Sequence, residues 1–355
     1  TGKNAELAAA KPLMQLYQQL YQAVLIPDVQ RPRRPPSPPA LPWLPRTSIL
    51  AADWPQGGTH RAFAAAFIGL SAGASRRAQR SGWTPASCLA TSTQASGACR
   101  LQSMTDREIL GNLQQRHGWS PKDMGAGGNC LFLSMALQVH PEDVQDLDSR
   151  SSAWADALGS NLADRWQDIS VGERASLLRR MAILDESEFI AELAAMRARS
   201  EPLPDATEWR TRELFTDMAE EFISSNKTEL AANIPGWDRQ GLYTRVREVV
   251  SSFTLDQICE FVLLHAEEYM QTTGREGNWA GSSEMAALSS TLQRPVQAYG
   301  NNWVSQDEVK LLAPEGDQDA WEVLPYFEAR CFEKARGDAI RVFQTHGGGH
   351  YQMLA

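Results

Sequence analysis

The spacing of apolar residues changes near residue 274 and divides the chain into a helical part and a β-rich part. Between residues 150 and 272 apolar side chains recur at intervals of three and four, which predicts several amphipathic helices separated by the breakers EPLPD and NIPGWD. After Gly274 one more helical run, EMAALSSTL, accompanies short β-rich runs bounded by turn residues: RPVQAYG, DEVKLLAP, WEVLPYF and AIRVFQT. We therefore expect a helical block followed by a small sheet.

The first hundred residues have a different composition. Residues 1–27 place apolar side chains at helical spacing and predict one amphipathic helix. Residues 28–104 are rich in Pro, Ser, Ala and Arg and predict a largely disordered linker, with a polyproline-type stretch near its start. Its PPSPP and RPRRPP segments could bind an SH3-type partner, although a plain spacer is the simpler interpretation. Order is expected to resume near Thr105, so the folded domain is assigned to 105–355.

Charge is distributed unevenly along the chain. The net charge of the chain is −9. Residues 29–105 carry +8, because they hold nine arginines and a single acid, and the charges of residues 1–28 sum to zero. The remainder of the chain therefore carries −17. An acidic domain disfavours nucleic acid as a partner, since phosphate binding needs a basic surface. It favours a partner or substrate tail that bears Arg or Lys, although acidic residues are also common on any solvated surface.

Cysteine usage and hydropathy bear on the compartment. The five cysteines show no zinc-ligand spacing, and an odd number makes a poor disulfide framework, so a reducing compartment is expected. No apolar run approaches the ~20 residues that a membrane span needs. We therefore expect a cytoplasmic protein without a membrane span, or one that acts in a host cytosol if it is a secreted effector.

Cys130 is the candidate nucleophile. Three of the five residues before it are glycine, and the apolar run LFLSMAL follows it, so it is predicted to begin a helix. The N–H groups and dipole of a helix start favour a thiolate, and a tight glycine turn can present backbone N–H groups to an oxyanion. The base must be a histidine; His350 lies between a glycine run and a terminal strand, and His346 is the alternative. Buried cysteines and terminal histidines are also common without any catalytic role.

Three segments resemble motifs of the ovarian-tumour (OTU) family of cysteine proteases, in the same order. Residues 127–136 (GGNCLFLSMA) are similar to the nucleophile motif D-G-N-C-L-[FY]-R-[AS]. Residues 269–300 match the family pattern of an aromatic residue, a Trp-Gly loop, an E-x-x-A-L-A helix and a strand. Residues 339–354 (AIRVFQTHGGGHYQML) look like the closing strand, glycine loop and H-[YW]-[ND] strand. The resemblance covers residues 105–355, with a helical insertion at about 141–262.

The resemblance implies a fold and an activity. The fold class is α+β, the papain-like OTU fold: a small, mostly antiparallel sheet with the nucleophile helix packed on it, and a large helical insertion. The implied enzyme is a thiol-dependent deubiquitinase that uses no cofactor or metal. Cys130 would attack the carbonyl of the C-terminal glycine of ubiquitin, and His350 would take the thiol proton and return it to the leaving amine.

The same resemblance suggests how the substrate is held. Backbone N–H groups at Gly128 and Asn129 would stabilise the oxyanion. Trp279 and Tyr351 would border the groove for the ubiquitin tail, although both aromatic rings also suit simple packing. Ubiquitin or polyubiquitin is the implied partner, and the helical insertion is a candidate for contacting its globular surface.

Two residues depart from the family pattern. Gly127 stands where the family has Asp, and Gln352 stands where the family has Asn or Asp. Gln352 is the first candidate for orienting His350, and Asp123 is the alternative. These departures also motivate a rival hypothesis, a catalytically inactive OTU-fold scaffold that binds ubiquitin. A thiol protease or acyltransferase unrelated to ubiquitin is a further alternative. The arginines within residues 174–180 are assigned to a helix surface without a site.

Overall fold

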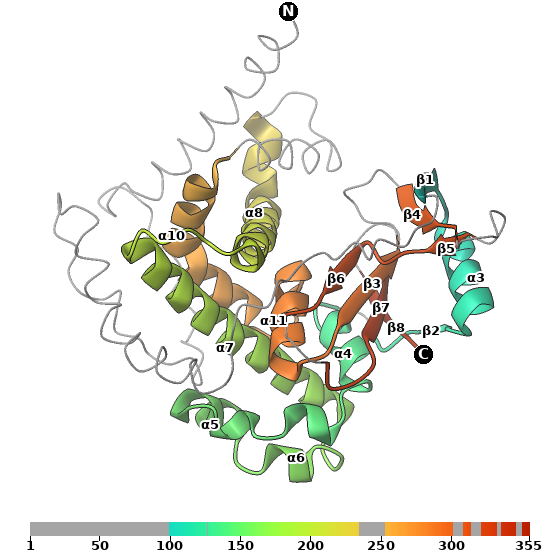
Figure 1. Ribbon diagram of the computed structural model, residues 1–355, viewed down its shortest axis with the longest axis horizontal. Helices are drawn as coiled ribbons and strands as arrows, with labels where there is room; N and C mark the ends of the chain where they lie inside the picture. The colour runs from blue at the N-terminus through green and yellow to red at the C-terminus, as the bar shows by residue number, and fades with distance from the viewer. Residues whose placement is uncertain are drawn as a thin grey trace, which may run out of the picture.

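The computed structural model describes residues 99–125, 127–233, 253–300, 308–313, 321–331, 335–345 and 350–355. The predicted helix 1–27, most of the linker 28–104 with its SH3-type segments, and His346 lie outside this part. A helical block stands on one side of a five-stranded sheet, and a smaller sheet with one helix lies at the opposite end (Figure 1). The α+β fold class predicted from the sequence is confirmed.

Eight α-helices are described. They are α3 (Asp106–His117), α4 (Cys130–Ala136), α5 (Ser152–Leu158), α6 (Leu162–Arg165), α7 (Val171–Ala198), α8 (Asp205–Asn233), α10 (Leu255–Thr273) and α11 (Ser282–Leu292). Two short 3-10 helices, Pro141–Val144 and Leu147–Ser149, connect α4 to α5. None of the described helices is long and apolar enough to cross a membrane.

The strands form two sheets. They are β1 (Cys99–Ser103), β2 (Pro121–Lys122), β3 (Val296–Gly300), β4 (Glu308–Leu312), β5 (Glu322–Val323), β6 (Phe327–Ala329), β7 (Ile340–Gln344) and β8 (Tyr351–Leu354). The larger sheet has the order β2-β8-β7-β3-β6, in which β3 and β7 are parallel and every other pair is antiparallel. The smaller sheet, β1-β4-β5, is antiparallel throughout. The expected small, mostly antiparallel sheet is therefore present.

Strand β1 lies inside the segment that the sequence assigned to the linker. It pairs with β4 over five residues, from Cys99 opposite Leu312 to Ser103 opposite Glu308. An ordered strand is therefore present before the predicted domain start at Thr105. Thr105 caps α3, since its hydroxyl accepts the Glu108 N–H and the Glu108 carboxylate accepts the Thr105 N–H.

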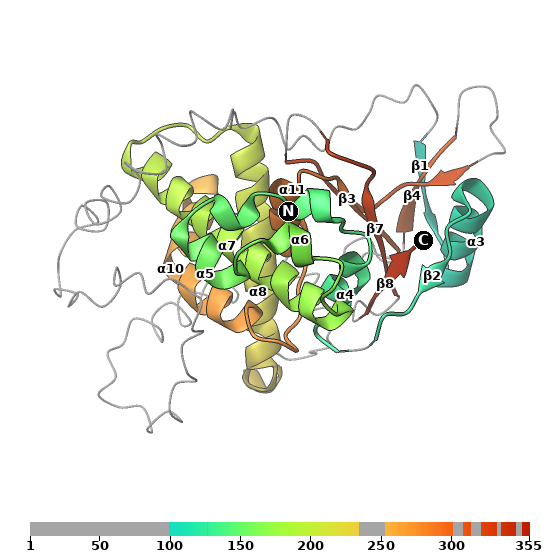
Figure 2. The same cartoon turned by 90° about the horizontal axis from the view of Figure 1, so that it is seen from below.

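Helix α4 lies between the larger sheet and the helical block (Figure 2). It contacts α7 on one side and β7 and β8 on the other. The core around it includes buried residues of α5, α6 and α7 such as Trp154, Leu162 and Leu178. The first half of the predicted insertion is therefore part of the same core as Cys130, and deleting residues 150–262 would remove core residues together with any partner site.

A second apolar cluster holds together the distal half of the helical block. Phe189 of α7, Phe215 of α8 and Val262 of α10 are among its buried members. This cluster joins α7, α8 and α10, the three long helices of the block (Figure 1). A role of the insertion in binding a partner can be tested only in this distal half, because the proximal half supports the main core.

Buried acidic groups gather where α7, α8, α10 and α11 meet. Glu186 and Glu284 are buried and Asp217 is half-buried; they come from three of these helices, and the Tyr269 hydroxyl of α10 donates a 2.6 Å hydrogen bond to Glu284. Among the described residues no hydrogen bond of normal geometry reaches either oxygen of Glu186. Burial raises the pKa of Glu186 well above its usual range and Glu284 raises it further, while Arg210 and the Ser283 hydroxyl oppose this only in part. The Glu186 carboxyl therefore stays protonated at pH values well above the pKa of an ordinary carboxyl group.

Replacing Glu186 with glutamine should raise the melting temperature near pH 7 by several degrees and change it little near pH 4. Because the folded-state pKa is raised, the contribution of this carboxyl to stability is complete below about pH 4.3 and is lost as pH rises through the folded value. Near pH 7 the carboxyl must take up a proton on folding, whereas the amide is neutral in both states, so we expect the amide to gain about 1–3 kcal/mol. Thermal melts at both pH values test this, with exposed Glu260→Gln as the control. Equal shifts at both pH values would contradict it.

Candidate active site

Cys130 begins helix α4, as the sequence pattern predicts. Its side chain is buried at 1% exposure, and its Sγ accepts a 3.4 Å hydrogen bond from the Tyr351 N–H. The Cys130 N–H donates to the Gly127 carbonyl at 3.1 Å. The thiol is therefore held between the start of α4 and the start of β8.

Burial raises the pKa of the Cys130 thiol, and this effect outweighs the others. The N–H groups of Tyr351, Leu131 and Cys130 and the charge of Arg179 act in the opposite direction. The thiol is therefore protonated near neutral pH. Nucleophilic chemistry at this sulfur requires a base that removes its proton.

The glycines before Cys130 are required by backbone geometry. Gly127 has φ +98°, a conformation that residues with a side chain rarely adopt, so the aspartate of the family motif would be strained there. A Cβ on Gly128 would lie 2.0 Å from the Gly277 carbonyl oxygen. The nucleophile loop, residues 127–129, thus packs backbone to backbone against the loop 274–281 that joins α10 to α11.

His350 lies directly before β8, and its ring contacts a carboxylate. Nε2 of the imidazole is 3.0 Å from Oδ1 of Asp123. The same oxygen accepts the Gly125 N–H at 2.9 Å, and this bond is the main reason why the pKa of Asp123 is lowered, with the charge of His350 contributing. Asp123 therefore stays ionised and can hold the imidazole.

The structure places Asp123, rather than Gln352, on the imidazole. Gln352 pairs opposite Phe343 in the sheet, and within the described chain its side chain forms no hydrogen bond to His350. Strand β2 pairs with β8 with Lys122 opposite Met353, so the next position, Asp123, comes opposite Gln352 and diagonal to His350. Diagonal neighbours share one face of a sheet and lie within reach of each other. The alternative orienter of the sequence analysis is the one that makes contact.

Cys130 and His350 are brought together through the backbone. The N–H that contacts the sulfur belongs to Tyr351, the residue directly after His350. No described hydrogen bond joins the sulfur to the imidazole itself. Because Nε2 faces Asp123, Nδ1 is the ring nitrogen left to face the thiol.

Comparisons with solved structures give several distant likenesses, of which two are OTU domains. No family model and no curated protein matches the sequence. The OTU domain of OTUD1 aligns with a TM-score of 0.26 and 11% identity, over 69% of this chain and 91% of that one. A viral OTU domain protease from Farallon virus aligns with a TM-score of 0.27 and 12% identity, over 67% of this chain and 83% of that one. Both are OTU domains. This is the family whose motifs the sequence resembles.

The two aromatic residues predicted to border the substrate groove differ in exposure. Trp279 lies in the loop between α10 and α11 and is 51% exposed, as a groove residue requires. Tyr351 is 4% exposed and belongs to the core cluster around α4. The Tyr351 ring packs in the core because this face of β8 lies against α4. Only the backbone N–H of Tyr351 contacts the site.

Arg179 of α7 is a site residue that the sequence analysis missed. It was assigned to a helix surface, yet it is 1% exposed and contacts the nucleophile loop. Position 179 lies on the same helix face as the buried Ala175 and Ala182, one turn to either side. That spacing was the available signal, because a charge within an apolar stripe must find buried partners.

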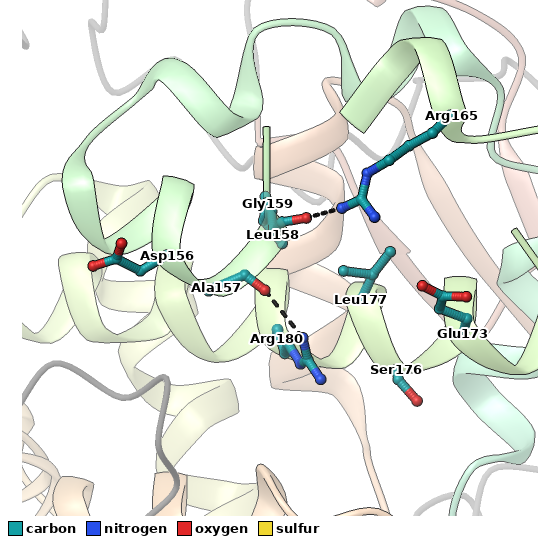
Figure 3. A pocket seen from close by; sticks show the side chains of 9 residues that line it. All are labelled: Asp156, Ala157, Leu158, Gly159, Arg165, Glu173, Ser176, Leu177 and Arg180. Atoms are coloured by element: carbon teal, nitrogen blue, oxygen red, sulfur yellow. Dashed lines mark hydrogen bonds between the residues drawn. The ribbon is translucent and has the colours of Figure 1, made fainter. Parts of the chain in front are cut away.

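A pocket of about 250 Å³ lies between α5, α6 and α7, apart from Cys130 and His350 (Figure 3). Its two arginines are directed at the end of α5: Arg165 donates to the Leu158 carbonyl, and Arg180 donates to the Ala157 carbonyl at 3.1 Å. These bonds satisfy carbonyls that a helix end leaves without partners. The arginines of this pocket thus have a structural role.

Proposed function

We propose that this protein is a thiol-dependent deubiquitinase that hydrolyses isopeptide or peptide bonds at the C-terminus of ubiquitin. The observation that carries the proposal is one connected set of contacts. Asp123 Oδ1 contacts His350 Nε2, and the N–H of Tyr351, the residue after His350, contacts Cys130 Sγ. A buried cysteine at a helix start, a histidine and a carboxylate that orients it are the groups that a cysteine hydrolase requires.

The proposed reaction uses these groups in turn. His350 Nδ1 takes the Cys130 proton while the sulfur attacks the glycine carbonyl carbon, and the carbonyl oxygen becomes an oxyanion. The N–H groups of Gly128 and Asn129 are the proposed oxyanion donors, since the Cys130 N–H is bonded to Gly127. When the C–N bond breaks, the leaving amine takes the proton from His350. Water, deprotonated by His350, then hydrolyses the thioester and restores the thiol.

A ubiquitin probe with a C-terminal electrophile should form a covalent adduct with the protein. Mass spectrometry should place the adduct on Cys130, and Cys130→Ala should abolish it. Cys259→Ala and Cys331→Ala are matched controls that should keep the adduct, because neither sulfur lies in the candidate site. An adduct that survives Cys130→Ala would contradict the proposal.

Three observations at Cys130 favour the rival function, an inactive ubiquitin-binding scaffold. Cys130 is 1% exposed, its thiol pKa is raised, and its sulfur has no described bond to His350. The same probe separates the two functions: a scaffold would bind ubiquitin without forming an adduct. A panel of di-ubiquitins and ubiquitin-like substrates then tests whether the hydrolase acts on ubiquitin or on an unrelated acyl group.

A further inference from the structure

Arg179 connects the nucleophile loop to the loop between α10 and α11. Its Nη2 donates to the Gly128 carbonyl at 2.9 Å and to Oδ1 of Asn129 at 2.8 Å. On the other loop Nη2 donates to the Asn278 carbonyl at 2.8 Å, and Nη1 donates to the carbonyl of Thr273, the last residue of α10. One guanidinium from the helical block therefore binds both loops that border the start of α4.

The surroundings of Arg179 orient its guanidinium. Its Cζ lies 4.4 Å from the centre of the Phe132 ring, which covers one face of the guanidinium plane. Among the described residues its hydrogen-bond acceptors are carbonyl oxygens and an amide oxygen, and none of them is a carboxylate. A buried charge paired in this way is costly as a purely structural device, since apolar residues of similar size often stabilise a core at least as well. This cost favours a functional reason for the charge.

The bond to the Gly128 carbonyl fixes the direction of the next amide group. In a planar trans peptide, the C=O of one residue and the N–H of the next point in opposite directions. Because Arg179 holds the Gly128 carbonyl, the Asn129 N–H points away from α7. The Asn129 side chain is held as well, by Arg179 and by the Gly277 N–H at 3.3 Å. The orientation of this peptide therefore depends on Arg179.

We propose that Arg179 is a positioning residue for the hydrolysis: it holds the nucleophile loop against the loop 274–281 so that the Asn129 N–H is fixed as an oxyanion donor. This inference rests on the proposed function. The charge of Arg179 also acts on the sulfur, because it lowers the pKa of Cys130 against the effect of burial. The helical block thereby takes part in the chemistry as well as in the core.

Steady-state kinetics on a fluorogenic ubiquitin C-terminal amide test the proposal. Arg179→Met should lower kcat about 10²–10³-fold, the loss expected when an oxyanion donor is misplaced, and leave KM within about twofold. Arg179→Lys should give an intermediate kcat, because an ammonium keeps the charge but cannot reach both loops. Arg180→Met is the matched control: Arg180 lies on the same helix but bonds the Ala157 carbonyl, so kcat should stay within about twofold. A kcat of Arg179→Lys equal to that of the wild type would overturn the proposal. If Arg179→Met does not fold, the comparison of Arg179→Lys with the wild type is the deciding test.

Alkylation of Cys130 by iodoacetamide gives a second readout that needs no ubiquitin. The alkylation rate is followed on the Cys130 peptide by mass spectrometry. In Arg179→Met a higher pH should be needed to reach the wild-type rate, whereas the pH profile of Arg179→Lys should stay near that of the wild type. If the wild type hydrolyses no ubiquitin but this shift appears, the proposed function fails while the action of Arg179 on Cys130 stands. Unchanged kinetics together with an unchanged alkylation profile in Arg179→Met would rule out the positioning role.

Discussion

Replacing His350 with alanine should lower kcat/KM for a ubiquitin C-terminal substrate by about 10²–10⁴-fold, the usual contribution of a general base. The reason lies in the state of the thiol: burial raises the pKa of Cys130, so few thiolates exist near neutral pH unless a neighbouring base takes the proton. His350 lies beside the residue whose N–H contacts the sulfur, and Asp123 holds its ring. Binding of ubiquitin to Cys130→Ala and to Cys130→Ala/His350→Ala, measured by calorimetry, should be equal.

The pH dependence of the His350→Ala protein provides a further check. Without the base, the remaining rate should keep rising with pH beyond the ordinary thiol range, because it then depends on unaided ionisation of a thiol whose pKa is raised. The exposed His140 is a suitable control, and His140→Ala should keep the wild-type rate and profile. Activity of His350→Ala within tenfold of the wild type would assign the base to another group, with His346 as the next candidate.

The parts of the fold that rest on local periodicity were predictable from the sequence. The amphipathic runs of 150–272 became α7, α8 and α10, and RPVQAYG and AIRVFQT became β3 and β7. Strand β1 was not predictable in this way, because the apolar and polar alternation of CRLQS spans only four residues and its Leu101 is 62% exposed rather than buried. Its order comes from pairing with β4, some two hundred residues away. Such pairing leaves no signal in the strand itself.

The helical insertion shows a second limit of local patterns. Three-and-four spacing indicates which face of a helix is buried, but it does not indicate what covers that face. Trp154 and Trp166 were therefore placed in an added arm, whereas they are buried in the core that contains Cys130. The role of Arg179 was not predicted for a similar reason, since its partners include carbonyl oxygens of two glycine-containing loops rather than acidic side chains. A charge that binds backbone has no partner in the sequence pattern.

The orienting residue shows how register completes what a motif leaves open. The H-x-[ND] pattern directs attention to Gln352, on the same strand as the histidine, and the spacing alone cannot favour a residue from another strand. Pairing of β2 with β8 supplies that residue, because it carries Asp123 to the position opposite Gln352. A short Asp at the diagonal then reaches the imidazole. We propose that this contact takes the place of the usual Asn or Asp after the histidine.

Replacing Asp123 with alanine should therefore lower kcat roughly 10²–10³-fold, whereas Gln352→Ala should stay within about threefold of the wild type. Asp123 is bonded to His350 Nε2 and so leaves Nδ1 as the nitrogen that takes the thiol proton in the proposed reaction, and no described bond gives Gln352 this role. Since the pKa of Asp123 is lowered, its carboxylate is ionised throughout the neutral range, and the difference between the two variants should not change between pH 6 and 8. Kinetics of both variants on the same ubiquitin amide, with alkylation of Cys130 as a test of the intact thiol, measure this difference. The reverse order of effects would return the orienting role to Gln352 and leave the Asp123 contact as a surface ion pair, an outcome that its 60% exposed side chain makes worth testing.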